Sequence, residues 1–328
     1  MAINDLKNTI LENRLNRSNM VQYGIWSNCS NKCDFCLIEK HYYRDSATMI
    51  SYLQEVIDNV KIQDWANKFS DGISLLGGEL YFITDKAVQD KFMELIDVII
   101  EYVLKVSKNP NCKYSTVTNG IYEPSFLYRV IDRIIEKAGI QYVDVNFSYD
   151  LKYRFHSEEA RNQCLQNIID FHKRYNYRIG VQMILTQYLI DMINIGEFSI
   201  DKWQNEIAPG SILEFLYPHK IHTGCILPDF NFKRYDFIKF MRNLHKTNPE
   251  NFYNFVSSVR HSSVFKYTGL YIDENGITHP EPVLSDGKEI INAACGHSAL
   301  YQCYADSDKC MLCDLNNIID TIRNNGDF

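Results

Sequence analysis

The sequence predicts an α/β protein, a partial (βα)6 TIM-like barrel that carries a small cysteine-rich C-terminal extension. Three observations predict this fold. Short apolar segments of strand length alternate with longer segments whose apolar residues recur at helical spacing. This alternation stops near residue 230, after six units rather than the eight of a closed barrel. Polar or glycine-rich motifs follow four successive strands, at the edge where parallel barrels gather their functional residues.

Each strand of the barrel is predicted from a short apolar run, and each helix from apolar residues on one face. The expected strands are 23–26, 72–76, 113–118, 141–148, 178–186 and 211–217. The expected helices are 47–60, 85–106, 125–137 and 157–175. Pro124 and Gly139 bracket the third helix, and Ser157 is placed to cap the fourth. Such strand–helix repeats form parallel sheets.

The chain divides into three predicted parts. Residues 1–20 form an amphipathic N-terminal helix, residues 21–230 form the barrel, and residues 231–328 form the extension with an auxiliary metal site. Within the extension the expected elements are helices at 234–245, 250–259 and 315–323, and a hairpin at 269–281.

Composition indicates the cellular location of the protein and the kinds of partner it is expected to have. The 328 residues are 45% hydrophobic, enough for a large core, and the net charge of -7 argues against a nucleic-acid partner. No apolar run reaches the length of a membrane span, and the N-terminal segment lacks the features of a secretory signal. We therefore expect a cytoplasmic protein without a membrane partner. Its ten cysteines are then expected to bind metal or to pack, rather than to form disulfides.

The first cysteine group follows the first strand with the spacing C-x3-C-x2-C, at Cys29, Cys33 and Cys36. Three thiolates can hold three irons of a [4Fe-4S] cluster and leave the fourth iron open. Structural zinc needs a fourth protein ligand, for which His41 is the local candidate. The alternative is a loop of three unrelated cysteines.

This motif, with Phe35 before its last cysteine, resembles the radical S-adenosylmethionine superfamily. The resemblance implies that the open iron binds S-adenosylmethionine and that the reduced cluster cleaves it. The resulting 5′-deoxyadenosyl radical then takes a hydrogen atom from a substrate. It also implies an electron donor such as flavodoxin or ferredoxin. The cofactor performs the difficult step, and the protein positions it.

Residues at the following strand ends resemble the cofactor-binding positions of that superfamily. Gly77, Gly78 and Glu79 resemble its glycine-rich motif, whose glycines allow close approach and whose carboxylate accepts from an ammonium group. Ser148 and Asp150 resemble polar residues near the ribose and carboxylate of the cofactor. Thr118, Asn119 and Thr186 are further candidates for lining the same cavity. For each of these positions the alternative is an ordinary turn.

The second cysteine group has the spacing C-x7-C-x6-C-x2-C, at Cys295, Cys303, Cys310 and Cys313. Four thiolates can complete the shell of a second [4Fe-4S] cluster or of a structural zinc, and His297 could compete as a ligand. The tail resembles the SPASM and Twitch extensions of radical enzymes, which carry auxiliary clusters. It departs from them at Glu281, where a cysteine is expected after the hairpin.

No catalytic side chain is identified beyond two candidates near the end of the sixth strand, Cys225 and Tyr217. For Cys225 the alternative is a buried free thiol. We expect an enzyme that acts on a peptide or protein side chain, because related extensions occur in peptide-modifying members. The alternatives are a radical enzyme acting on a small molecule or nucleotide, and a non-catalytic protein that binds an iron–sulfur cluster or zinc.

Overall fold

The computed structural model describes residues 20–26, 28–31, 33–34, 45–66, 71–216, 232–252, 255, 270–272 and 278–280. Six parallel strands form the centre of the fold, and they follow one another in sequence order across the sheet. They are β1 (Met20–Gly24), β2 (Gly72–Leu76), β3 (Lys113–Thr118), β4 (Val143–Ser148), β5 (Gly180–Ile184) and β6 (Ile212–Leu216). The predicted α/β fold with an open, six-stranded parallel barrel is therefore confirmed.

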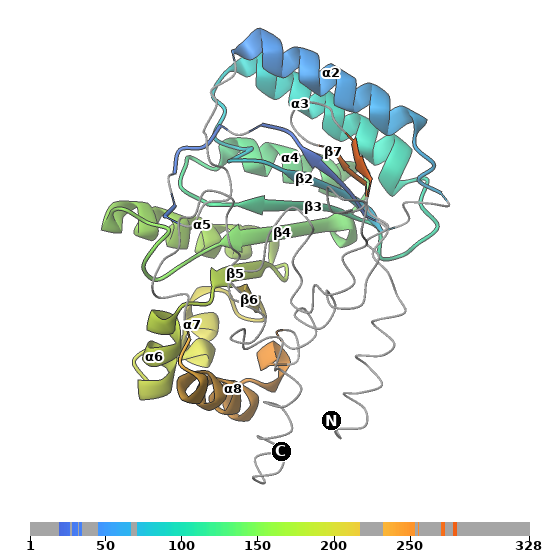
Figure 1. The fold of residues 1–328 in the computed structure, drawn as a ribbon. Helices are drawn as coiled ribbons and strands as arrows, with labels where there is room; N and C mark the ends of the chain where they lie inside the picture. The colour runs from blue at the N-terminus through green and yellow to red at the C-terminus, as the bar shows by residue number, and fades with distance from the viewer. Residues whose placement is uncertain are drawn as a thin grey trace, which may run out of the picture.

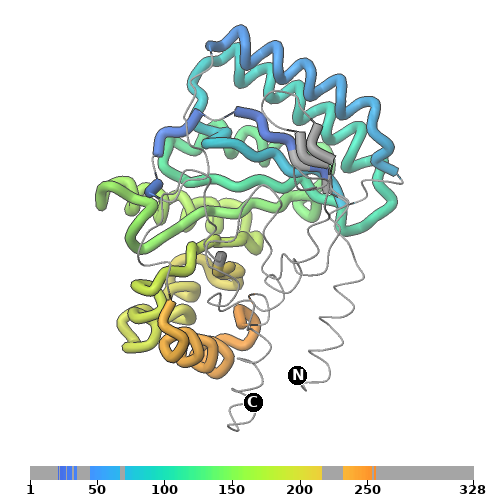
Figure 2. The backbone as a smooth tube through the Cα atoms, in the orientation of Figure 1, coloured from blue at the N-terminus to red at the C-terminus, as the bar shows by residue number. Residues whose placement is uncertain are grey.

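Helices follow the strands, as the sequence predicts. They are α2 (Ser46–Ile62), α3 (Lys86–Ile99), α4 (Ser125–Lys137), α5 (Glu158–Tyr175), α6 (Gln187–Ile195), α7 (Ile200–Ile207) and α8 (Arg234–Thr247). Three details differ from the expectation. The first strand runs over Met20–Gly24 rather than over 23–26. The helix predicted over 85–106 ends at residue 99 and continues as a π-helical turn, Ile100–Leu104, and a helix pair, α6 and α7, joins β5 to β6. Figure 1 shows these helices packed around the curved sheet, and Figure 2 shows the chain path through the repeated units.

The two faces of the sheet have opposite character. Val145, Phe147 and Phe215 belong to the apolar face, where Phe147 contacts Phe171 of α5 at 5.5 Å between ring centroids and Phe215 contacts Phe240 of α8 at 5.6 Å. The other face carries polar residues in β3 to β6: Ser115 and Asn146 donate to Asp144, and Gln182 donates to Glu214. The apolar face forms the core under the helices.

The predicted hairpin adds two strands to this sheet. Strands β7 (Leu270–Ile272) and β8 (Thr278–Pro280) pair antiparallel, which confirms the expected hairpin strands. Strand β7 also pairs in parallel with β1, so β1 lies between two strands rather than at an edge. Sequence periodicity did not predict this pairing, because β7 and β1 are far apart in the chain.

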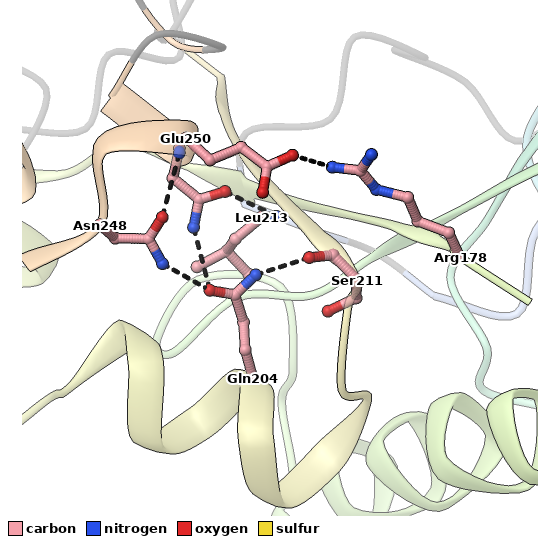
Figure 3. A network of polar contacts seen from close by, with 7 residues as sticks. Arg178, Gln204, Ser211, Leu213, Asn248 and Glu250 are labelled. Atoms are coloured by element: carbon pink, nitrogen blue, oxygen red, sulfur yellow. Dashed lines mark hydrogen bonds and ion pairs between the residues drawn. The ribbon is translucent and has the colours of Figure 1, made fainter. Parts of the chain in front are cut away.

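Residues 232–252 also pack against the barrel. Figure 3 shows a polar network in which Gln204 of α7 donates to the Ser211 carbonyl at 2.6 Å and accepts from Asn248 at 2.9 Å. Asn251 donates to the same Gln204 oxygen at 3.0 Å, and its own side-chain oxygen accepts from the backbone of Leu213 at 3.3 Å. The domain boundary near residue 230 stays a prediction, and so does the helix over residues 1–20, which lies outside the described residues except for Met20 in β1.

In the described part of the chain, no helix combines the length and the apolar character needed to cross a lipid bilayer.

Candidate functional site

The loops after β1 and β2 run side by side. The backbone N–H of Ile25 donates to the Leu76 carbonyl at 2.8 Å, that of Gly78 donates to Trp26 at 2.8 Å, and that of Glu79 donates to Asn28 at 2.8 Å. The parallel pairing of the two strands thus continues beyond both of them. It places the Gly77–Glu79 motif directly against the residues that lead into Cys29.

This close approach explains the first glycine of the motif. A β-carbon on Gly77 would lie 2.5 Å from the carbonyl oxygen of Trp26, a backbone atom that is fixed by its own pairing with Gly78. No side chain fits there without separating the two loops.

Glu79 is completely buried and accepts hydrogen bonds from three residues. The backbone N–H of Asn119 donates to one carboxylate oxygen at 2.6 Å, and the backbone N–H of Tyr81 donates to the other at 3.2 Å. The hydroxyl of Thr118 lies 3.0 Å from both oxygens. Burial raises the pKa of Glu79 to about 7, although the hydrogen bonds oppose that rise.

Asn119 connects this carboxylate to the first cysteine. Its side-chain amide donates to the sulfur of Cys29 at 3.4 Å, while its side-chain oxygen accepts from the backbone of Ile121 at 2.8 Å. At the end of β3, the predicted residue Thr118 therefore contacts Glu79, and the predicted residue Asn119 contacts both Glu79 and Cys29. Three strand ends converge at this point.

The sulfurs of Cys29 and Cys33 are surrounded by nitrogen donors. The backbone N–H of Asn31 donates to Cys29 at 3.4 Å, and the side-chain amide of Asn31 donates to Cys33 at 3.1 Å. The guanidinium of Arg154 donates to Cys33 at 3.7 Å. The sequence did not predict Asn31 or Arg154 as site residues. Arg154 could have been found as a positively charged residue four positions after Asp150, in the loop after β4.

The remaining predicted binding residues lie at the same edge of the sheet but make local contacts. Asp150 is buried, and one of its oxygens accepts from the backbone of Lys152 at 2.7 Å and of Tyr153 at 2.8 Å. Thr186 caps α6 by accepting from the backbone of Leu189 at 3.0 Å. Ser148 is buried at the end of β4. Their proposed contacts with a cofactor stay predictions.

Several predicted residues lie outside the described residues. They are Phe35, Cys36, Tyr217, Cys225, Cys295, Cys303, Cys310 and Cys313. Cys112 and Cys164 belong to neither of the two predicted cysteine groups. Both are fully buried, and burial raises the pKa of the Cys164 thiol to about 12. An inert packing role fits both thiols.

The donor set around Cys29 and Cys33 fits an iron–sulfur cluster. Amide and guanidinium N–H groups that point at sulfur stabilise the negative charge of thiolates and of the cluster they bind. Within the described ranges, no three potential ligand side chains gather into a metal site. The described ranges include two of the three predicted ligands, since Cys36 lies outside them.

Comparison with known proteins gives a structural likeness only. No protein-family model matches the chain, and no curated protein matches it. The crystal structure of Streptococcus suis SuiB is 14% identical with a TM-score of 0.47, and the match covers 89% of this chain and 67% of SuiB. For SuiB bound to S-adenosylmethionine the identity is 15% and the TM-score 0.49, and the match covers 85% of this chain and 64% of that one.

A third structure, SuiB bound to the precursor peptide SuiA, is 16% identical with a TM-score of 0.33, and the match covers 94% of this chain and 68% of that one. This chain therefore matches about two thirds of the length of these proteins. Because these identities and TM-scores are low, the likeness does not assign a class to the protein. The class follows from the strand order and the candidate site of the chain itself. Together these define an open α/β barrel with a cysteine-bearing loop at the carboxyl ends of its strands.

Proposed function

We propose that this chain is a radical S-adenosylmethionine enzyme. The observation that carries the proposal is the convergence of three loops: the Cys29 loop after β1, the Gly77–Glu79 loop after β2, and Thr118–Asn119 after β3. In an α/β barrel, chemistry takes place at this edge of the sheet. The thiolate spacing and the donors aimed at the sulfurs favour an iron–sulfur cluster at the same place.

Cys29, Cys33 and Cys36 would hold the cluster in this proposal. When bound, a [4Fe-4S] cluster with an open iron supplies a site for S-adenosylmethionine and the electron for its reductive cleavage. The residues of the chain position the cluster and the cofactor. In this proposal the Gly77–Glu79 loop binds the amino group of the cofactor, and the carboxylate of Glu79, which accepts from three residues, holds that loop against the end of β3.

The experiment that tests this function is incubation of the reconstituted, reduced protein with S-adenosylmethionine, followed by measurement of 5′-deoxyadenosine. Product should form with the wild-type protein, and it should disappear in a Cys29→Ala/Cys33→Ala/Cys36→Ala variant. Absence of product from a wild-type protein that carries its full iron content would instead identify a non-catalytic metal-binding protein.

The substrate class is a finer proposal. We propose a peptide or protein side chain, because the cysteine spacing between Cys295 and Cys313 resembles that of extensions found in peptide-modifying enzymes. Co-expression with any small peptide that is found to be encoded beside this chain, followed by mass spectrometry, tests that class. A mass change that depends on Cys29, Cys33 and Cys36 would support it. Turnover of a small molecule or nucleotide without any peptide would contradict it.

The metal at the second cysteine group is a separate question. An auxiliary cluster predicts about eight irons per chain, whereas zinc predicts about four irons and one zinc. A Cys310→Ala/Cys313→Ala variant should lose the metal of that site alone. Elemental analysis of the wild-type protein and this variant therefore distinguishes the two.

A further inference from the structure

Arg154 brings a buried positive charge to the loop that carries the first two predicted cluster ligands. The residue is 9% exposed, and its guanidinium donates to the sulfur of Cys33 at 3.7 Å. Its backbone carbonyl accepts from the side-chain amide of Asn31 at 2.8 Å, and the same amide donates to Cys33. Arg154 therefore contacts the cysteine loop through both its side chain and its backbone.

The loop that carries Arg154 has a fixed shape. One oxygen of Asp150 accepts from the backbone of both Lys152 and Tyr153, which closes a tight turn after β4. The carbonyl of Tyr153 then accepts from the backbone of Asp34 at 3.1 Å. The loop after β4 thus binds the cysteine loop on both sides of Cys33, at residue 31 and at residue 34.

The charge of Arg154 acts on its surroundings. Burial raises the pKa of Asp150 and of Glu79, and the positive charge of Arg154 is among the interactions that oppose this rise for both carboxyl groups. The guanidinium charge thus lies close to two buried carboxyl groups and to the Cys33 sulfur, where low dielectric strengthens its field.

We propose that Arg154 is a positioning residue that holds the Cys33 sulfur and raises the reduction potential of the cluster. This inference rests on the proposed function. Reduction adds one negative charge to the cluster, so a nearby cation and an N–H donor to sulfur stabilise the reduced state more than the oxidised state. Arg154 would thereby make reduction of the cluster more favourable, while the turn at Asp150 keeps the guanidinium beside the Cys33 sulfur.

The test is a redox titration of the reconstituted full-length protein, monitored by the electron paramagnetic resonance signal of the reduced cluster. Three variants are compared with the wild type: Arg154→Gln removes the charge and keeps a donor, Arg154→Lys keeps the charge, and Arg129→Gln removes a surface charge from α4. Arg129 is a matched control because it is half-exposed and pairs with Asp90 at 2.7 Å.

The potential of Arg154→Gln should shift to a more negative value, that of Arg154→Lys should shift less, and that of Arg129→Gln should not change. If Arg154→Gln loses its iron while Arg154→Lys retains it, the charge is needed to hold the cluster, which also supports the proposal. An Arg154→Gln potential equal to that of the wild type would overturn it. So would equal loss of iron from both Arg154 variants, because the residue would then act through packing.

The two proposals can fail separately. If the wild-type protein gives no [4Fe-4S] signal after reconstitution, the proposed function itself is wrong. If the wild-type signal is present and reducible but insensitive to the charge at position 154, only the role of Arg154 is wrong.

Discussion

Among single residues, Glu79 joins the three loops of the candidate site. It follows β2, its backbone pairs with the residues leading into Cys29, and its side chain accepts from the end of β3. A buried carboxyl group of this kind is stable in its ionised form only while its donors remain in place. The position of Asn119, and through it the amide that reaches Cys29, depends on this carboxyl group.

The raised pKa of Glu79 makes the stability of the protein depend on pH. Below the unfolded-state pKa of 4.5, Glu79 is protonated in the folded and the unfolded protein, and its contribution to the free energy of unfolding is fully present. As the pH rises toward the folded-state pKa of about 7, only the unfolded state releases the proton, so about 3 kcal/mol of stability is lost.

Glu79→Gln should therefore flatten the fall in the free energy of unfolding between pH 4.5 and 7. Urea unfolding at several pH values, on wild-type and variant proteins prepared identically, measures this slope. Glu94→Gln, on the exposed side of α3, is the control and should keep the wild-type slope. Equal slopes for Glu79→Gln and the wild type would show that the carboxyl group titrates normally.

Gly77 and Gly180 allow a second comparison at the residue scale. An added β-carbon would meet backbone at Gly77, the Trp26 carbonyl, but the end of a side chain at Gly180, Asn146. Backbone cannot move without separating the loops, whereas a side chain can rotate. We expect Gly77→Ala to cost about 2–3 kcal/mol and Gly180→Ala to cost roughly 1 kcal/mol. Thermal unfolding of both variants checks this order, and the reverse order would contradict it.

Among the elements, α7 is held to its neighbours by buried polar contacts. Gln204 joins α7 to the start of β6 and to the residues that follow α8, and it is largely buried. An ion pair between Arg178 and Glu250 adds a further link between β5's leading residues and this region. These contacts fix the last helices to the open edge of the barrel.

Gln204→Ala should lower the free energy of unfolding by about 2–4 kcal/mol, because it leaves the Ser211 carbonyl and two amide donors without their partner. Gln166→Ala is the matched control, since Gln166 lies on an exposed face of α5 and contacts only Asp170 among the hydrogen bonds described. Chemical denaturation measures both variants. Equal effects would show that water replaces the network around Gln204.

For the whole molecule, the hairpin of β7 and β8 changes the position of β1 in the sheet. Without it, β1 would be an edge strand, and the loop carrying Cys29 would follow a strand with one unpaired side. Pairing with β7 therefore supports the strand that leads into the candidate site, and it uses residues more than 240 positions away in sequence.

Ile272→Pro tests this support, because proline removes a backbone donor from the strand between β1 and β8. Backbone amides of β1 should exchange with solvent at least roughly tenfold faster in this variant, while those of β6 should not change. Hydrogen exchange followed by mass spectrometry resolves the two strands. Ile272→Ala keeps the donor and serves as the control; unchanged exchange in β1 of the proline variant would show that β7 adds no protection.

The sequence by itself determined the six strands, the helices that follow the first four of them, and the strand ends at which the polar motifs lie. These features are local: apolar periodicity, capping residues such as Ser157, and short apolar runs such as residues 72–76. The spacing of Cys29 and Cys33 was visible for the same reason. Candidate site residues near strand ends, such as Glu79 and Asn119, follow from the rule for parallel barrels.

Only the tertiary structure decided which of these residues meet. The contact of Arg154 with Cys33 and of Asn119 with Cys29 joins residues 121 and 90 positions apart, and the pairing of β7 with β1 spans a still longer separation. No periodic pattern encodes such contacts, because they arise when the strands pack into one sheet and bring their ends together. The side chain of Asp150 accepts from the backbone of Lys152, and that of Thr186 caps α6. Both contacts depend on dihedral angles that the residue type alone does not determine.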